Sequence, residues 1–110
     1  TQIGEIAGAV VYFGDMKYYG SGGPATREKN AAGFRLLAVS EKARGQGVGR
    51  LLTEACIERA RNNMCAQMII HTTKAMLPAW KMYESIGFKR SPELDFAQGD
   101  LMVFGFRLLL

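Results

Sequence analysis

The sequence contains few of the residues that build metal sites, disulfide frameworks or membrane spans. It has two cysteines, Cys56 and Cys65, and one histidine, His71. The two cysteines fit no metal-binding spacing, so we expect free thiols in a cytoplasmic protein without a bound metal. The longest apolar runs are far too short to cross a bilayer, and no segment resembles a signal peptide. The sequence therefore predicts no membrane partner.

The composition is typical of an ordered globular protein. The 110 residues are 48% hydrophobic and 22% charged, which predicts a single domain over residues 1–110 with a small core. The net charge is +4, and the 14 lysines and arginines are scattered along the chain. Because there is no basic run and no interleaved aromatic platform, we expect no nucleic-acid partner. A modest positive charge suits a ligand that carries phosphate groups.

The most informative segment is a glycine-dense turn at residues 44–50, which read RGQGVGR. It lies between a strand-like apolar run and a helix-like amphipathic run. A turn that opens a helix presents several backbone N–H groups in one direction, and the helix dipole adds positive charge there. The spacing does not fit a P-loop, because Arg50 and Leu51 stand where Lys and Ser or Thr are needed. It does not fit the dinucleotide fingerprint either, because only Val48 separates the second and third glycines.

Two motifs in order carry a family resemblance. Residues 34–52 (FRLLAVSEKARGQGVGRLL) resemble the acetyl-coenzyme A motif of the GNAT superfamily of N-acetyltransferases, and residues 79–88 (AWKMYESIGF) resemble its later helix and turn. A strand-like segment at residues 68–72 separates them. The resemblance covers residues 4–105 and implies an α/β fold with a mixed, mainly antiparallel central sheet flanked by helices. The family normally has a strand and two helices before the point where this chain begins, so the resemblance implies an N-terminally truncated form.

The resemblance also implies a site for acetyl-coenzyme A. The backbone before the glycine turn is expected to lie along the pantetheine arm, and the turn itself is expected to ligate the pyrophosphate. The implied cofactor-binding residues are Leu37, Ala38, Val39, Arg44, Gly45, Gln46, Gly47, Val48, Gly49 and Arg50. Tyr83 stands where many members of the family keep a tyrosine that protonates the leaving thiolate, so it is the expected general acid. The alternative is that Tyr83 only packs in the core.

No general base is evident. Many members of the family carry a glutamate at the position of Gly33, and an asparagine that touches the coenzyme at the position of Met76. His71 has a suitable usual pKa, but a buried structural histidine is the favoured interpretation. Three acidic residues remain without positional support: Glu5, Asp15 and Glu28.

Hydrophobic periodicity predicts the remaining elements. Strands are expected over residues 3–13, 34–39, 67–72, 88–96 and 101–109, and helices over residues 47–63 and 77–86. Pro78 fits the first turn of the second helix, and Gly87 fits its C-terminus. On the first helix, the face toward the sheet is expected to comprise Val48, Leu51, Leu52 and Ala55.

The sequence thus predicts an N-acetyltransferase that transfers an acetyl group from acetyl-coenzyme A to a primary amine by direct attack on the thioester. The acceptor is a small molecule or a peptide amine, which the sequence does not specify. One alternative is a coenzyme A-binding module without catalytic activity. Another is an interaction domain that forms a homodimer through an exposed strand.

Overall fold

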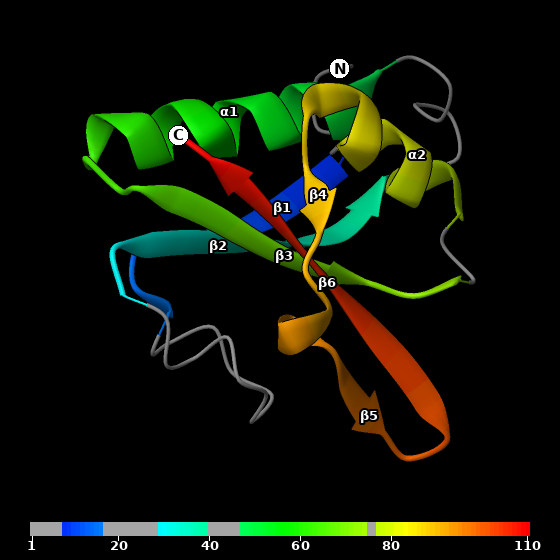
Figure 1. Ribbon diagram of the computed structural model, residues 1–110. Helices are drawn as coiled ribbons and strands as arrows, with labels where there is room; N and C mark the ends of the chain where they lie inside the picture. Colours follow the sequence, from blue (N-terminus) through cyan, green and yellow to red (C-terminus); the bar gives the residue numbers. More distant parts are fainter. Residues whose placement is uncertain (1–7, 17–28, 40–46, 75–76) are drawn as a thin grey trace.

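The described part of the chain alternates strands and helices around one central sheet (Figure 1). The computed structural model describes residues 8–16, 29–39, 47–74 and 77–110. In chain order the elements are β1 (Gly8–Phe13), β2 (Ala31–Val39), α1 (Val48–Asn62), β3 (Gln67–Thr72), α2 (Leu77–Ile86), β4 (Lys89–Arg90), the 3-10 helix η5 (Pro92–Leu94), β5 (Phe96–Gln98) and β6 (Leu101–Leu109).

The sheet has six strands in the order β1-β2-β3-β6-β4, and β5 pairs with another stretch of β6. Among the described strands only β2 and β3 run parallel, whereas β1–β2, β3–β6, β4–β6 and β5–β6 are antiparallel. The parallel pair is joined through α1, as parallel strands require a crossover connection. This arrangement confirms the predicted mixed, mainly antiparallel α/β sheet.

The strand predicted over residues 88–96 is wrong in its middle. The extended backbone stops after Arg90, one 3-10 turn begins at Pro92, and β5 begins only at Phe96. Proline has no N–H to donate to a sheet ladder, which is why the strand is interrupted there. The turn buries Leu94, whose side chain is 1% exposed. The hydrophobic pattern was thus misread as one continuous strand, whereas Leu94 is buried from a 3-10 turn.

Both helices lie on the same face of the sheet (Figure 1). The main core forms between them and the sheet, and includes Cys56 and Ile57 of α1, Ile70 of β3 and Phe106 of β6. The opposite face carries a smaller buried cluster of Met16, Ala31, Ile69 and Leu94. Within β3, Met68 and Ile70 therefore face the helices while Ile69 faces away, as the period of two predicts.

The buried face of α1 differs from the predicted one. Leu51 is 66% exposed, Ala55 is exposed, and Val48 and Leu52 are only half-buried. The buried residues are Thr53, Cys56, Ile57 and Ala60. Three of these side chains, those of Thr53, Cys56 and Ala60, are small. The Thr53 hydroxyl donates a hydrogen bond of 2.8 Å to the Gly49 carbonyl within the helix. A polar residue, Thr53, thereby occupies a core position that was not among the predicted ones.

Strand β6 continues beyond the body of the sheet and forms a projecting hairpin with β5 (Figure 1). Gly99, at the tip, has a φ of 63°, which suits glycine in a tight turn. Among the described helices, none has the length and apolar composition needed to cross a membrane. Within the same residues, no cluster of three or more histidine, cysteine or acidic side chains is arranged to hold a metal ion.

Candidate functional site

The two central strands separate partway along their length. β2 and β3 are paired only where residues 31–33 face residues 67–69. Beyond this point β2 continues to Val39 with β1 as its partner, and β3 continues to Thr72 with β6 as its partner. Figure 1 shows the two strands diverging toward their C-terminal ends. The region beyond Gly33 and Ile69, here called the split, leaves the facing edges of β2 and β3 without each other as pairing partners in the middle of the sheet.

The backbone of β2 is irregular along the split. Ala9 of β1 pairs with Ala38, whereas the next residue, Val10, pairs with Leu36. Leu37 is therefore an extra residue on β2, in a β-bulge. Bulges redirect backbone groups and are frequent beside active sites. The predicted cofactor residues Leu37, Ala38 and Val39 all lie on this part of β2, beyond its last pair with β3.

The N-terminus of α1 presents backbone donors that the helix itself does not use. Gly47 precedes the helix with a φ of 78° and a ψ of 13°, a left-handed conformation that glycine adopts without strain. The first helical hydrogen bond runs from the Leu51 N–H to the Gly47 carbonyl at 3.0 Å. The N–H groups of Val48, Gly49 and Arg50 thus have no acceptor within the helix, and within the described residues no side chain caps them.

The space next to Gly47 is open, because a Cβ built there meets no atom within 4 Å. Arg44, Gly45 and Gln46 lie outside the described residues. The Arg50 side chain joins α1 to α2: its Nη1 donates to Ser85 Oγ at 3.0 Å, and its Nε lies 3.2 Å from Glu54 Oε1. These contacts are solvent-exposed, and exposed ion pairs contribute little to stability. Arg50 can therefore leave Ser85 and Glu54 for another anion at a small cost in free energy.

Tyr83 lies on α2 against the β2 side of the split. Its side chain is 4% exposed, and its ring packs edge-on against Phe34 and Phe88, with centroid distances of 6.1 and 5.8 Å. The helix ends just after it, where the N–H groups of Gly87 and Phe88 both donate to the Tyr83 carbonyl. Burial raises the pKa of the Tyr83 phenol above its usual value. The phenol is consequently held in one place and kept protonated.

The contacts of His71 are those of a histidine that supports the fold. His71 faces away from the helices, and its Nε2–H donates to the Leu94 carbonyl at 2.9 Å. Its ring packs against Phe96 with a centroid distance of 5.2 Å. Burial lowers the pKa of the imidazole, and the hydrogen bond to Leu94 opposes this only in part. His71 is therefore neutral and engaged near neutral pH, as the favoured interpretation of the sequence expects.

The remaining positions discussed for a general base or for a coenzyme contact provide no further candidate among the described residues. Gly33 is buried in β2, between its partners Phe13 on β1 and Ile69 on β3. Asp15 is exposed at the end of β1. Glu5, Glu28 and Met76 lie outside the described residues.

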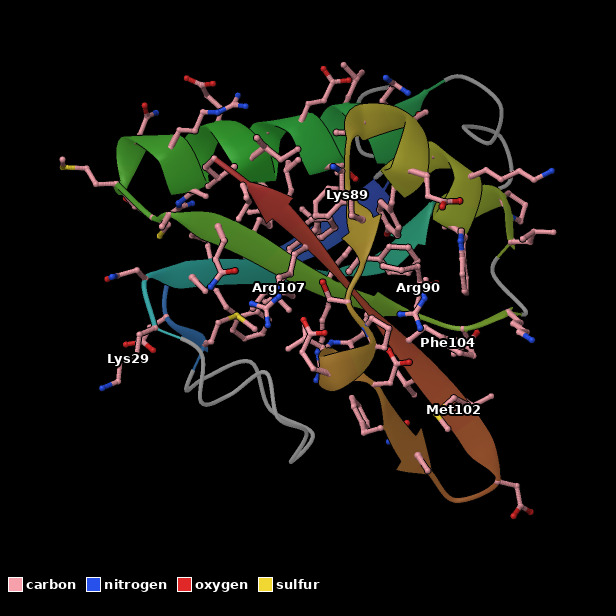
Figure 2. The ribbon with its side chains drawn as sticks, in the orientation of Figure 1. Lys29, Lys89, Arg90, Met102, Phe104 and Arg107 are labelled. Carbon is pink, nitrogen blue, oxygen red and sulfur yellow. The ribbon has the colours of Figure 1, made fainter. Side chains whose placement is uncertain are left out.

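A cation anchors the hairpin to the sheet next to α2. Arg90 donates to both carboxylate oxygens of Asp95 at 2.9 and 2.7 Å and to the Gly105 carbonyl at 2.7 Å. Figure 2 shows Arg90 beside Phe104, and its guanidinium carbon lies 4.9 Å from the centre of that ring. The Gly105 N–H in turn donates to Asp95. This network holds the segment between β4 and β5 in place. The hydrogen bonds from Arg90 lower the pKa of the Asp95 carboxyl.

Sequence reasoning missed Thr72, the last residue of β3. Its side chain is 4% exposed, and its Oγ1 is buried without a hydrogen-bond partner in the part of the chain that the structure describes. The sequence gives only a weak indication. Thr72 ends a strand whose other residues on this face, Met68 and Ile70, are apolar, so a hydroxyl interrupts the pattern.

The sequence and the fold both match acetyltransferases. A family model described as the acetyltransferase (GNAT) family matches residues 2–88. The chain is 32% identical to human N-acetyltransferase 8B over 73 residues, which are 66% of this chain and 32% of that protein. It is also 32% identical to N-acetylaspartate synthetase of Danio rerio over 68 residues, which are 62% of this chain and 24% of that protein. The chain thus spans a third or less of these two relatives.

Among solved structures, an aminoglycoside acetyltransferase in complex with coenzyme A superimposes with a TM-score of 0.75 at 20% identity. The superposition covers 99% of this chain and 62% of that one. At this level of identity the likeness concerns the fold. It places the split sheet and the two helices in a known architecture.

Proposed function

The chain belongs to the acetyltransferase (GNAT) family, and from this premise we propose that it binds acetyl-coenzyme A and transfers the acetyl group to a primary amine. The observation that carries the proposal is the split between β2 and β3, which has the uncapped N-terminus of α1 at one end and Tyr83 packed beside it. Acetyl-coenzyme A supplies the activated acetyl thioester. The described residues fit such a ligand in three places.

The first place is the N-terminus of α1, which would hold the pyrophosphate. Three backbone N–H groups, those of Val48, Gly49 and Arg50, lack helical acceptors, and the helix dipole adds positive charge at the same point. The open space beside Gly47 allows a close approach of phosphate oxygens. The Arg50 guanidinium would add a charge-assisted contact after leaving Ser85 and Glu54. Arg44, Gly45 and Gln46 complete this group in the proposal.

The second place is the β2 backbone from Leu37 to Val39, which would pair with the amides of the pantetheine arm. Extended ligands often add to an unpaired strand edge through main-chain hydrogen bonds. The bulge at Leu37 turns a backbone group out of the β1–β2 ladder. An N–H at this position would stabilise the negative charge that develops on the carbonyl oxygen of the acetyl group.

The third place is Tyr83 Oη, which would hold the proton that the leaving sulfur requires. A phenol with a raised pKa is fully protonated at neutral pH, and this is the state that a general acid needs. The amine acceptor must arrive uncharged or lose its proton to water, because no described side chain is placed as a base. A small-molecule or peptide amine remains the proposed acceptor class. A homodimer and a cytoplasmic location also remain predictions from the sequence.

The experiment is a thiol-release assay with acetyl-coenzyme A and a panel of amines. The panel includes aspartate, since one relative is named an N-acetylaspartate synthetase, together with other amino acids, peptides and polyamines. Amine-dependent release of coenzyme A supports the proposal. Tight binding of acetyl-coenzyme A without release by any amine would favour the alternative of a binding module. A protein that neither binds acetyl-coenzyme A nor releases coenzyme A would contradict both the proposed function and the binding-module alternative.

A further inference from the structure

Thr72 has an unsatisfied hydroxyl in the interior of the protein. The side chain is 4% exposed, and within the described residues Oγ1 has no hydrogen-bond partner. The large majority of buried polar side-chain atoms in native proteins have a hydrogen-bond partner, because a group that loses its water on burial and gains no partner destabilises the fold. An unpaired buried hydroxyl at a strand end therefore points to a partner that arrives with a ligand.

The position of Thr72 indicates which ligand group this is. It lies in β3 three residues beyond the last pair with β2, so it borders the split. Its side chain shares the helix-facing side with Ile70, since side chains alternate along a strand. Ile70 belongs to the same buried cluster as Phe34 and Tyr83. Thr72 thus lies on the β3 wall of the split, whereas Leu37 lies on the opposite wall.

A second buried threonine shows that the missing partner is specific to Thr72. Thr53 on α1 is equally enclosed, with 0% of its side chain exposed. Its Oγ1 donates to the Gly49 carbonyl at 2.8 Å, so the helix itself satisfies it. A strand has no carbonyl one turn earlier for such a hydroxyl to reach, so β3 itself does not satisfy Thr72 in this way.

We propose, on the basis of the function proposed above, that the Thr72 hydroxyl hydrogen-bonds a polar group of the pantetheine arm of acetyl-coenzyme A from the β3 side of the split. The arm would then be held on two walls, by the β2 backbone on one side and by Thr72 on the other. Thr72 is a positioning residue in this arrangement. It contributes to the pantetheine half of the ligand and not to the nucleotide half, which α1 would bind.

The test compares Thr72→Val, which removes the hydroxyl and keeps the shape, with Thr72→Ser, which keeps the hydroxyl. Each protein is titrated calorimetrically with acetyl-coenzyme A and, separately, with adenosine 3′,5′-bisphosphate, which lacks the pantetheine arm. Thr72→Val should weaken acetyl-coenzyme A binding about five- to tenfold, as loss of one buried hydrogen bond does. It should leave the bisphosphate unchanged, and Thr72→Ser should bind both ligands like the wild type.

Thermal unfolding of the ligand-free proteins gives an independent readout, with Thr53→Val as the matched control. Thr72→Val should melt at or above the wild-type temperature, because it replaces an unpaired buried hydroxyl with a methyl group. Thr53→Val should melt lower, because its hydroxyl has a partner. A ligand-free Thr72→Val protein that is destabilised like Thr53→Val would overturn the proposal.

The outcomes separate this inference from the proposed function. If the wild type binds acetyl-coenzyme A and Thr72→Val binds it equally well, the inference about Thr72 is wrong and the proposed function stands. If Thr72→Val loses affinity for both ligands equally, the inference is also contradicted, since the effect would not be confined to the pantetheine arm. If the wild type binds neither ligand, the proposed function fails and the inference fails with it.

Discussion

Tyr83 and Phe34 meet edge-to-face, with ring centroids 6.1 Å apart and ring planes at 69°. Phe34 is the first residue of β2 beyond its pairing with β3, and Tyr83 comes from α2, 49 positions later in the chain. The contact therefore places the phenol of a late helix where the central sheet begins to open. An aromatic pair of this kind also restricts the rotation of the tyrosine ring.

The proposed role of Tyr83 as general acid predicts that removing its hydroxyl greatly lowers the rate of acetyl transfer. Tyr83→Phe should lower kcat by about 10²- to 10⁴-fold, the usual contribution of a general acid. The ring contacts with Phe34 and Phe88 are kept, so thermal stability and acetyl-coenzyme A affinity should change little. The measurement is steady-state kinetics with whichever amine is turned over, across a range of pH. Because burial raises the pKa of the phenol, loss of the Tyr83 proton should lower the wild-type rate only in strongly alkaline solution.

Tyr12→Phe is the matched control. Tyr12 is on β1, which pairs with the edge of β2 opposite to β3, and its hydroxyl accepts a hydrogen bond of 2.9 Å from Asn63 at the C-terminal end of α1. This variant should keep the wild-type rate. An unchanged kcat in Tyr83→Phe, or an equal loss in both variants, would contradict a general-acid role for Tyr83.

Gly105 is required for packing and not for turn geometry. A Cβ at this position would overlap the side chain of Leu94 and press against its backbone, and Leu94 is fully buried. Gly105→Ala should therefore lower the free energy of unfolding by about 1–3 kcal/mol, as overpacking does. Chemical denaturation measures this loss. Gly14→Ala is the control, because its new Cβ would make only ordinary contacts of 3.4 Å or more; equal stability of the two variants would contradict the packing.

His71 predicts an acid-sensitive stability. Its pKa is lowered in the folded protein by burial, whereas the unfolded chain has the usual value of about 6.5. The unfolded state therefore binds more protons below this pH, and the free energy of unfolding should fall as the pH drops from about 6.5 toward 5. Above this window the contribution is complete.

The measurement is urea denaturation at several pH values for the wild type and for His71→Gln. His71 is the one histidine in the sequence, so no other side chain has its usual pKa in this window. The variant should be less stable at neutral pH, because the contact with Leu94 is weakened, but its stability should change less between pH 6.5 and 5. Parallel pH dependence in the two proteins would contradict the assignment.

The sequence predicted correctly those elements whose ends are set by residues at the ends themselves. The bounds of α2 agree with the prediction because Pro78 starts the helix and Gly87, with a φ of 121°, ends it. The buried face of α1 could not be predicted in the same way, since Thr53 is satisfied by a hydrogen bond that depends on the helix already being formed. Pro92 was the overlooked signal in the segment predicted as one strand.

The candidate site depended on pairing between distant segments. The glycine turn and Tyr83 are visible as motifs, but the split exists because β2 and β3 pair over three residues and then take different partners. The bulge at Leu37 is likewise a matter of register with β1. No local pattern encodes either feature. Thr72 became a candidate only once its burial and its unpaired hydroxyl were known.

The most direct test of the central claim is thermal unfolding with and without acetyl-coenzyme A, in the wild type and in two glycine variants. Gly47 and Gly99 both have positive φ, and at both a Cβ would meet no atom within 4 Å, so Gly47→Glu and Gly99→Glu carry the same charge and similar backbone strain. Only Gly47 adjoins the N-terminus of α1.

At a ligand concentration of about 100 times Kd, acetyl-coenzyme A should stabilise the wild type by about 2.7 kcal/mol, a rise in Tm of several degrees. Gly99→Glu should show the same rise, and Gly47→Glu should lose it, because a carboxylate would repel the pyrophosphate. A wild-type protein whose Tm does not respond to millimolar acetyl-coenzyme A, or a Gly47→Glu variant that responds fully, would contradict a cofactor site at the split and the N-terminus of α1.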